Sequence, residues 1–253
     1  MAESEPRDWQ LPSRWLSSKL LPMIEVRIVT SGIPPATAGL SLKIIAIAPL
    51  DRSSSAHILT LVSELHADLI VLPGYWHNTP SITRIRKALP KGAWVFLESR
   101  EKLHSLPVLI SSSAIVKLPQ QVFGTSPTKQ QLFDLESCFA HRTVQIGEQC
   151  VSFILCGEIN AFQTDGATKS GINLPFEILI NPAHFVMGRW HILGRKLSTL
   201  SHRGVVVHVA NNHKNSDRLT IDVRIYAGGR QVGERNQNEF AAWCTYDAPT
   251  ASQ

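Results

Sequence analysis

Short runs of consecutive apolar residues constrain this chain more than any other feature of its sequence. Four of these runs cover residues 43–48, 68–73, 151–156 and 205–210. They show almost no alternation between apolar and polar residues, which is typical of strands buried on both faces. Such strands need further layers of structure on either side, so the sequence predicts a layered α/β domain.

Segments with helical spacing separate these runs. In residues 56–66, for example, apolar residues recur at the interval of one helical turn. Gly228 and Gly229 predict a hairpin turn near the end of the chain. Strands that alternate with helices indicate a sheet covered by helices. The expected strands are 43–48, 68–73, 94–97, 108–116, 151–156, 178–181, 205–210, 219–226 and 231–234. The expected helices are 56–66, 81–89 and 188–202, with a further helix that begins near Lys129.

Residues 1–40 differ in composition from the rest. They contain five prolines and one strand-like stretch, at 24–29, and residues 31–39 have the glycine and proline content of a linker. We therefore expect an N-terminal proline-containing extension over residues 1–40, which packs on the domain or contacts a partner. One domain is expected over residues 41–250.

The charge balance is mild. Among 253 residues, 25 basic side chains stand against 20 acidic ones, a net charge of +5, and the hydrophobic content of 43% suffices for a sizeable core. A nucleic-acid-binding protein is expected to cluster Lys and Arg into a stripe. The nearest approach, at residues 84–91, is equally typical of a solvated helix face. Nucleic acid is therefore an unlikely partner, and a basic protein acting on nucleic acid is the weakest of three interpretations.

The terminal sequence and the cysteines predict a cytoplasmic protein. The first eight residues include four charged ones, and no apolar signal core follows them. No apolar run approaches the roughly 20 residues that span a bilayer. No membrane partner is therefore expected. The cysteines form no CxxC pair and no zinc-ligand spacing, so we expect free thiols, no metal and no cofactor. The four cysteines are Cys138, Cys150, Cys156 and Cys244.

Cys156 has the most suggestive position of the four. It ends the expected strand 151–156 and is followed at once by Gly157. Ligands of α/β sheets bind beyond the carboxyl ends of the strands. A glycine here lets a substrate approach the backbone, and its N–H can help to hold an oxyanion. The alternative is a structural cysteine packed in the core, which is the commoner case for a cysteine considered alone.

Lys117 follows another expected strand and supplies a second group that thiol chemistry uses. Hydrolysis of a carbon–nitrogen bond by a thiol needs a thiolate, a base that forms it and later activates water, and a cation or donor that stabilises the oxyanion. Lys117 is our candidate for the cation. Lys129 is a rival, but it lies at the start of an expected helix, where lysines are usually solvated.

Five short stretches of the sequence are more specific together than any one of them alone. In their order along the chain they resemble the motifs of the nitrilase superfamily of carbon–nitrogen hydrolases, over most of residues 41–235. The resemblance implies a four-layer αββα sandwich and a Glu–Lys–Cys triad on three strand ends, with Lys117 and Cys156 as two of its members. The stretches are 67–73, Lys117-Leu-Pro119, 154–158, 178–183 and the region from Trp190 to a closing strand that ends in Asn211.

One position departs from the family's pattern. Where the first motif continues with the glutamate that acts as base, this chain has Gly74. Glycine cannot move protons, so Glu98 and Glu158 become the candidates for a substitute, although either can be a surface or supporting acid instead. A Cys–His pair is also conceivable, with His141 or His184 brought near by folding, and the spacing singles out neither.

Two functions are consistent with the sequence. The first is a hydrolase in which the cysteine attacks a small amide or nitrile and forms a thioester acyl-enzyme. The second is a catalytically inactive, nitrilase-like binding or assembly protein, which the missing glutamate favours and the retained lysine and cysteine disfavour. The resemblance also suggests a homo-oligomer. The expected oxyanion and substrate pocket consists of Gly157, Gly74, Tyr75, Trp76 and Asn181, of which the two aromatic residues have simple packing as their alternative.

Overall fold

The computed structural model describes residues 41–50, 52–74, 76, 78–101, 104–184, 190–211 and 221–249. The expected extension over residues 1–40 lies outside the described residues, and so does Tyr75. The described residues all belong to one unit, Thr37–Gln253.

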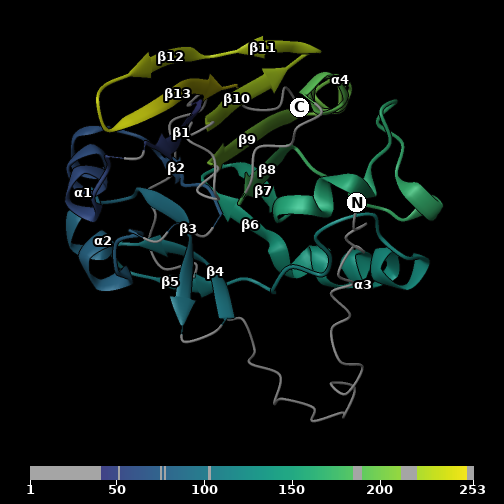
Figure 1. The fold of residues 1–253 in the computed structure, drawn as a ribbon, viewed down its shortest axis with the longest axis horizontal. Helices are drawn as coiled ribbons and strands as arrows, with labels where there is room; N and C mark the ends of the chain where they lie inside the picture. Colours follow the sequence, from purple (N-terminus) through teal and green to yellow (C-terminus); the bar gives the residue numbers. More distant parts are fainter. Residues whose placement is uncertain are drawn as a thin grey trace, which may run out of the picture. The chain divides into compact units, whose positions relative to one another are not determined.

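The strands form two sheets (Figure 1). The first has seven strands in the order β12-β13-β1-β2-β3-β4-β5, and the second has six in the order β11-β10-β9-β8-β7-β6. The strands of the first sheet are β1 (Leu42–Pro49), β2 (Leu69–Val71), β3 (Trp94–Glu101), β4 (His104–Ser111), β5 (Ile115–Lys117), β12 (Glu234–Gln237) and β13 (Ala241–Ala248). Those of the second are β6 (Thr143–Ile146), β7 (Gln149–Phe153), β8 (Ile178–Ala183), β9 (Val205–Asn211), β10 (Ile221–Ala227) and β11 (Arg230–Val232).

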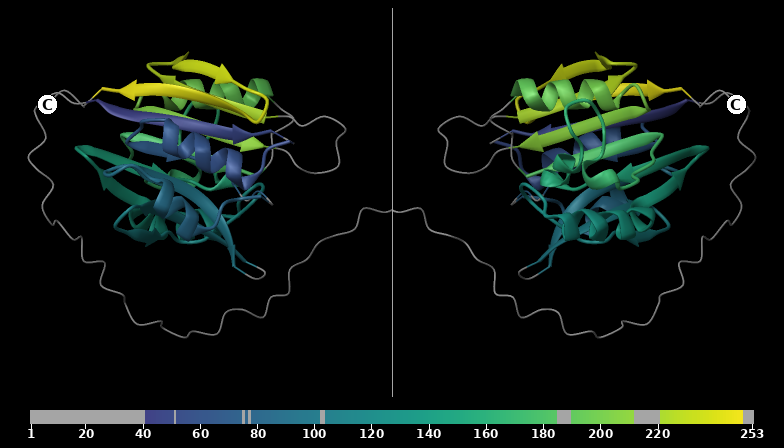
Figure 2. Two further views of the ribbon diagram at one scale, coloured as in Figure 1. Left: turned by 90° about the vertical axis from the view of Figure 1, so that its left-hand side faces the viewer. Right: turned by 90° about the vertical axis from the view of Figure 1, so that its right-hand side faces the viewer.

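The helices cover the outer faces of the two sheets. Helices α1 (Ser55–Glu64) and α2 (Ile82–Ala88) share a hydrophobic cluster with the first sheet, and α3 (Lys129–Phe139) and α4 (Trp190–Leu200) share another with the second. Figure 2 shows these helices in front of their sheets from the two opposite sides. The third cluster lies between the sheets. The domain is therefore the expected αββα sandwich.

The apolar runs owe their lack of alternation to this layering. In β1, Ile44 and Ala46 belong to the cluster between the sheets, whereas Ile45 and Ile47 belong to the cluster under α1 and α2. Because successive side chains of a strand point to opposite faces, both faces of a central strand must be apolar.

The expected strand at 108–116 is wrong, because the chain turns within it. β4 and β5 are separate antiparallel strands that pair Ile110 with Ile115. The Ser111 hydroxyl accepts hydrogen bonds from the backbone N–H groups of Ser113 and Ala114 and so stabilises the turn. Three strands were not expected at all, namely β6, β12 and β13.

Candidate active site

Cys156 lies at a sharp turn between β7 and a short 3₁₀ helix, η2 (Cys156–Ala161). Its φ angle is +42°, in the left-handed region that non-glycine residues rarely occupy. Such backbone strain persists only where surrounding contacts enforce it, and it clusters at functional sites. The side chain is half-buried. The turn therefore presents the thiol beyond the carboxyl end of β7, where the sequence predicted it.

His184 and Glu98 form a hydrogen-bonded pair beside this thiol. The Nε2–H group of His184 donates to Oε2 of Glu98 at 2.6 Å, and the Cys156 side chain is hydrogen-bonded to the same imidazole. The Glu98 side chain is 2% exposed and that of His184 is 23% exposed. The three side chains thus form a series of thiol, imidazole and carboxylate, with the imidazole in the middle and still open to solvent.

Both sheets contribute to this series. Glu98 comes from β3 of the first sheet, two residues after Phe96, and Cys156 follows β7 of the second sheet, three residues after Phe153. The rings of Phe96 and Phe153 stack between the sheets with their centroids 5.0 Å apart. This stack joins the strand that carries the carboxylate to the strand that leads to the thiol.

The surroundings of His184 favour its charged form. Burial by itself lowers the pKa of this imidazole, but the hydrogen bonds to Cys156 and Glu98, together with their negative charges, outweigh it and raise the pKa from 6.5 to about 10. At neutral pH His184 is therefore an imidazolium that lies between the side chains of Cys156 and Glu98. This is the charge state in which a neighbouring imidazole supports a thiolate.

Gly74 makes room for His184. A Cβ atom at position 74 would lie 2.7 Å from Cδ2 of His184 and 2.9 Å from its backbone nitrogen. The Gly74 N–H also donates to the carbonyl oxygen of Ala183 at 3.1 Å, so the two chain segments are in direct contact. Any larger residue at position 74, glutamate included, would collide with His184 where it now lies.

A buried polar network lies behind Cys156. The Asn181 Nδ2 group donates to the carbonyl oxygens of Ile154 at 2.9 Å and of Cys156 at 3.1 Å. Because its nitrogen donates twice, its Oδ1 accepts from Nδ1–H of His208, at 2.8 Å. Burial, followed by the charge of Arg224, lowers the pKa of His208 to about 3, so this ring is neutral. The network fixes the carbonyl group of the strained residue.

Comparison with solved structures identifies this architecture. A CN-hydrolase superfamily protein from Xanthomonas campestris matches with a TM-score of 0.55 and 14% identity, over 82% of this chain and 91% of its own. A glutamine-dependent NAD(+) synthetase from Cytophaga hutchinsonii matches with a TM-score of 0.50 and 13% identity, over 82% of this chain and 43% of its own. An amidase from Nesterenkonia sp. matches with a TM-score of 0.50 and 11% identity, over 83% of this chain and 92% of its own.

The chain has the CN-hydrolase fold. At identities of 11–14%, what the comparison establishes is the fold. No family model matches the sequence, and no curated protein matches it either. The resemblance noted from the motifs of the nitrilase superfamily is thus confirmed at the level of the fold.

Within this CN-hydrolase fold, Glu158 lies away from the thiol's hydrogen-bonded series. It is fully buried and paired with the equally buried Arg142, and it also accepts from the N–H groups of Val122 and Leu155. Burial raises the pKa of Glu158, an effect that Arg142 and the two backbone bonds oppose. Its carboxylate therefore holds η2 in place, whereas Glu98 contacts His184.

Gly157 is a glycine because of packing. A Cβ atom there would lie 2.0 Å from the carbonyl oxygen of Gly124, so the backbone of Gly124, and not a substrate, occupies this space. Its backbone N–H can still serve as a donor. The first backbone hydrogen bond of η2 joins the Glu158 N–H to the Leu155 carbonyl. The N–H groups of Cys156 and Gly157 come before this bond, so the helix itself gives them no acceptor.

The remaining expected residues lie elsewhere. Lys117, on β5, has an exposed side chain on the face opposite to Val116 and Leu118, which pack between the sheets. Trp76 is buried in the cluster under α1 and α2, consistent with its packing alternative, and Asn181 is bonded behind the cysteine rather than lining a pocket. His141 is exposed in the short helix after α3. Sequence spacing offered no signal that would have selected His184 over His141.

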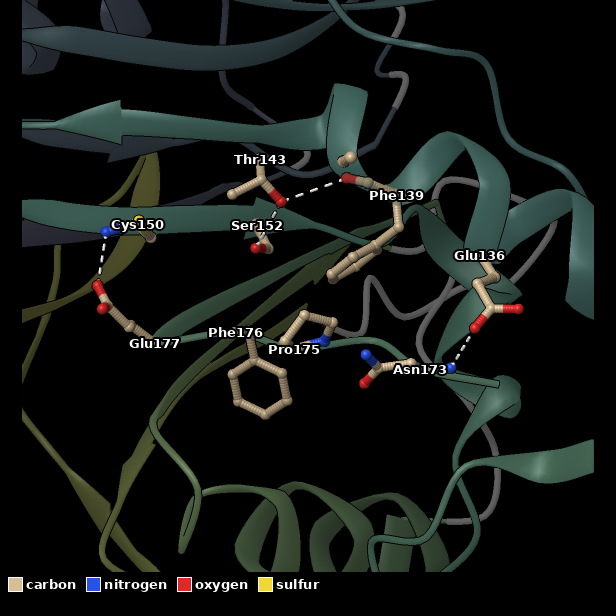
Figure 3. Close-up of a pocket in the computed structure, with 10 residues that line it drawn as sticks. Glu136, Phe139, Thr143, Cys150, Ser152, Asn173, Pro175, Phe176 and Glu177 are labelled. Atoms are coloured by element: carbon tan, nitrogen blue, oxygen red, sulfur yellow. Dashed lines mark hydrogen bonds between the residues drawn. The ribbon is translucent and has the colours of Figure 1, made fainter. Parts of the chain in front are cut away.

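One cleft in the structure is not lined by Cys156. It is a cleft of about 590 Å³ beside α3, β6 and β7 (Figure 3), where the carboxylates of Glu136 and Glu177 already accept from the backbone N–H groups of Asn173 and Cys150. Its walls also include Phe139, Pro175 and Phe176 (Figure 3).

Metal-binding clusters and membrane-spanning helices are both absent from the described residues. These residues contain no group of three or more His, Cys, Asp or Glu side chains placed to hold a metal ion. Within the same ranges, no helix has the length and apolar character needed to cross a membrane.

Proposed function

We propose that this chain is a thiol-dependent carbon–nitrogen hydrolase in which Cys156 is the nucleophile, His184 the general base and acid, and Glu98 the carboxylate that orients the imidazole. The observation that carries the proposal is the series of hydrogen bonds from Cys156 through His184 to Glu98. A nucleophile, a base and a third group that orients the base are the general arrangement of covalent catalysis by a side chain. The fold shared with an amidase is consistent with this reaction class.

In the first half of the reaction, the Cys156 thiolate attacks the carbonyl carbon of an amide and forms a carbon–sulfur bond. The carbonyl electron pair moves onto oxygen, and the N–H group of Gly157 donates to this oxyanion. The imidazolium of His184 then gives its proton to the leaving nitrogen. The carbon–nitrogen bond breaks, ammonia or an amine leaves, and a thioester remains on Cys156.

In the second half, water attacks the thioester. The neutral His184 takes a proton from this water, and the tetrahedral intermediate collapses with release of the carboxylic acid. The products are the acid, the thiolate and the imidazolium, so the site returns to its first state. The Glu98 carboxylate stabilises each imidazolium that forms.

The position of Gly74 bears on the alternative of an inactive binding protein. That alternative rested on the absence of a glutamate at position 74. In the proposed mechanism His184 takes over the proton transfers, and the glycine is what allows His184 to lie there. A missing base is thus replaced by another base from the neighbouring segment, and Lys117 is not required as the cation.

The test is turnover of a panel of small amides and nitriles by wild-type protein and by three variants. Ammonia release and the intact mass of the protein are followed together. We expect a thioester adduct and ammonia from the wild type and none from Cys156→Ala. We expect His184→Ala to lower turnover by about 10²–10⁴-fold, the usual contribution of general acid–base catalysis.

The matched control is His141→Ala, which removes an exposed histidine and should leave turnover unchanged. Equal losses in the two histidine variants would contradict the role of His184. Absence of any adduct in the wild type would favour the inactive binding protein instead.

A further inference from the structure

Asn211 is a buried polar residue that the proposed mechanism does not use. It ends β9 and is fully buried. Neither its Oδ1 nor its Nδ2 atom has a hydrogen-bond partner within the described ranges. Leaving a buried donor or acceptor unpaired costs about 1–3 kcal/mol. Because nearly all buried polar groups in folded proteins are bonded, an amide with both ends unpaired calls for an explanation, and a bound ligand group is one.

Asn211 lies next to the proposed base. β8 and β9 are parallel, and the last residues paired between them are Ala183 and Ala210. His184 and Asn211 each come one residue later. Backbones of neighbouring strands are roughly 5 Å apart, so the two residues begin side by side at the same edge of the sheet.

The side chains of these two residues also share a direction. In β9, Val205, Val207 and Val209 all belong to the cluster between the sheets. Because strand side chains alternate, Asn211 points the same way. Asn211 therefore points into the space between the sheets, on the side from which His184 and Glu98 approach Cys156.

Asn181 provides a comparison within the same domain. It is equally buried, but its nitrogen donates twice and its oxygen accepts from His208. The buried asparagine that supports the backbone, Asn181, therefore has hydrogen-bond partners at both ends of its amide group. Asn211 has the same side chain, the same burial and none of those bonds.

We propose that Asn211 is the residue that selects the substrate of the proposed hydrolase, by binding a second amide group carried on the acyl part of that substrate. This inference rests on the proposed function, because it places the second group beside His184. A carboxamide side chain has one donor end and one acceptor end, so another amide is its natural complement. The substrate class is therefore a short diamide rather than a simple aliphatic amide.

The experiment measures binding in a protein that cannot react. Cys156→Ala is titrated calorimetrically with malonamide, succinamide and glutaramide, and with 4-methylpentanamide, in which an isopropyl group replaces one carboxamide of succinamide. We expect at least one diamide to bind about tenfold more tightly than 4-methylpentanamide, the effect of two hydrogen bonds of ordinary net strength. Adding Asn211→Leu should abolish this preference.

The same substitution has a signature in stability. Asn211→Leu removes an unpaired buried amide, so its thermal midpoint should equal or exceed that of the parent, whereas loss of a structural asparagine would lower it. Asn211→Ala, which is smaller, serves as a second variant and should lose the preference as well. If no diamide binds better than 4-methylpentanamide, or if the preference survives both substitutions, the proposal is overturned.

Ammonia release by the wild type separates this inference from the proposed function. Selective binding of a diamide without ammonia release supports the Asn211 subsite and contradicts the hydrolase. Release of ammonia from amides of both kinds at equal rates supports the hydrolase and contradicts the subsite.

Discussion

Gly74 and His184 illustrate how one residue sets what its neighbour can do. The missing side chain at position 74 leaves space that the His184 ring and backbone occupy. His184 in turn reaches both Cys156 and Glu98. The departure from the family's pattern is thus compensated within contact distance, by a residue 110 positions later in the chain.

At this scale we predict that Gly74→Ala lowers ammonia release by about tenfold or more. The added Cβ atom would lie 2.9 Å from the backbone nitrogen of His184, which cannot move away as a flexible side chain could. Displacement of a catalytic group by a fraction of an ångström is costly in rate. The control is Gly194→Ala in α4, whose Cβ atom would meet nothing closer than 3.4 Å. Equal activity of the two variants would argue against a shared site.

The short helix η2 is the element on which the site depends. Asn181 holds the carbonyl oxygen of Cys156 at its start, Glu158 bonds the backbone ahead of it, and the Lys196 ammonium donates to the carbonyl oxygen of Ile159 at 3.1 Å. Burial, followed by the charge of Lys169, lowers the pKa of Lys196 to about 8. These bonds offset the cost of the positive φ angle at Cys156.

We predict that Asn181→Ala lowers the free energy of unfolding by about 1–3 kcal/mol, because two buried carbonyl groups and His208 lose their partner. The same change should slow alkylation of Cys156 by iodoacetamide, since the turn that presents the thiol is released. Urea unfolding and intact-mass kinetics measure the two effects. Asn173→Ala, at an exposed position, should change neither. Unaltered alkylation in Asn181→Ala would show that the turn holds without this residue.

At the scale of the whole domain, the site exists only where the two sheets meet. Cys156 and His184 follow strands of the second sheet, whereas Glu98 lies in β3 of the first sheet and Gly74 follows β2. Charging of His184 is therefore linked to folding. The folded pKa of about 10 exceeds the ordinary value of 6.5, so the folded state binds this proton more tightly than the unfolded state does.

We accordingly predict that His184 stabilises the domain fully below about pH 6.5 and that this contribution falls as the pH rises toward about 10. The measurement is the difference in unfolding free energy between wild type and His184→Gln at pH 6 and pH 9. Taking the difference removes the titration of Lys196, whose pKa is shifted in the opposite direction. A difference that stays constant between the two pH values would contradict the prediction.

The sequence by itself determined the buried strands and the place of the thiol. Runs such as 43–48 and 205–210 lack alternation between apolar and polar residues, which predicts strands covered on both faces, whereas the four-layer sandwich was implied by the resemblance to the nitrilase superfamily. Cys156 ends one of these runs, so its location beyond a strand follows from local pattern. The apolar pattern does not reveal the break at Ser111–Ser113, because apolar residues flank the serine turn on both sides.

Only the tertiary structure decided which groups surround the thiol. Glu98 and Glu158 look alike in the sequence, but one faces His184 across the two sheets and the other is paired with Arg142. Likewise, Gly157 must be a glycine because the backbone of Gly124 packs against it, and Gly74 must be one because His184 packs against it. The physical reason is that these contacts join segments far apart in the chain. The packing of the two sheets determines which segments meet, and the local periodicity of the sequence does not predict that packing.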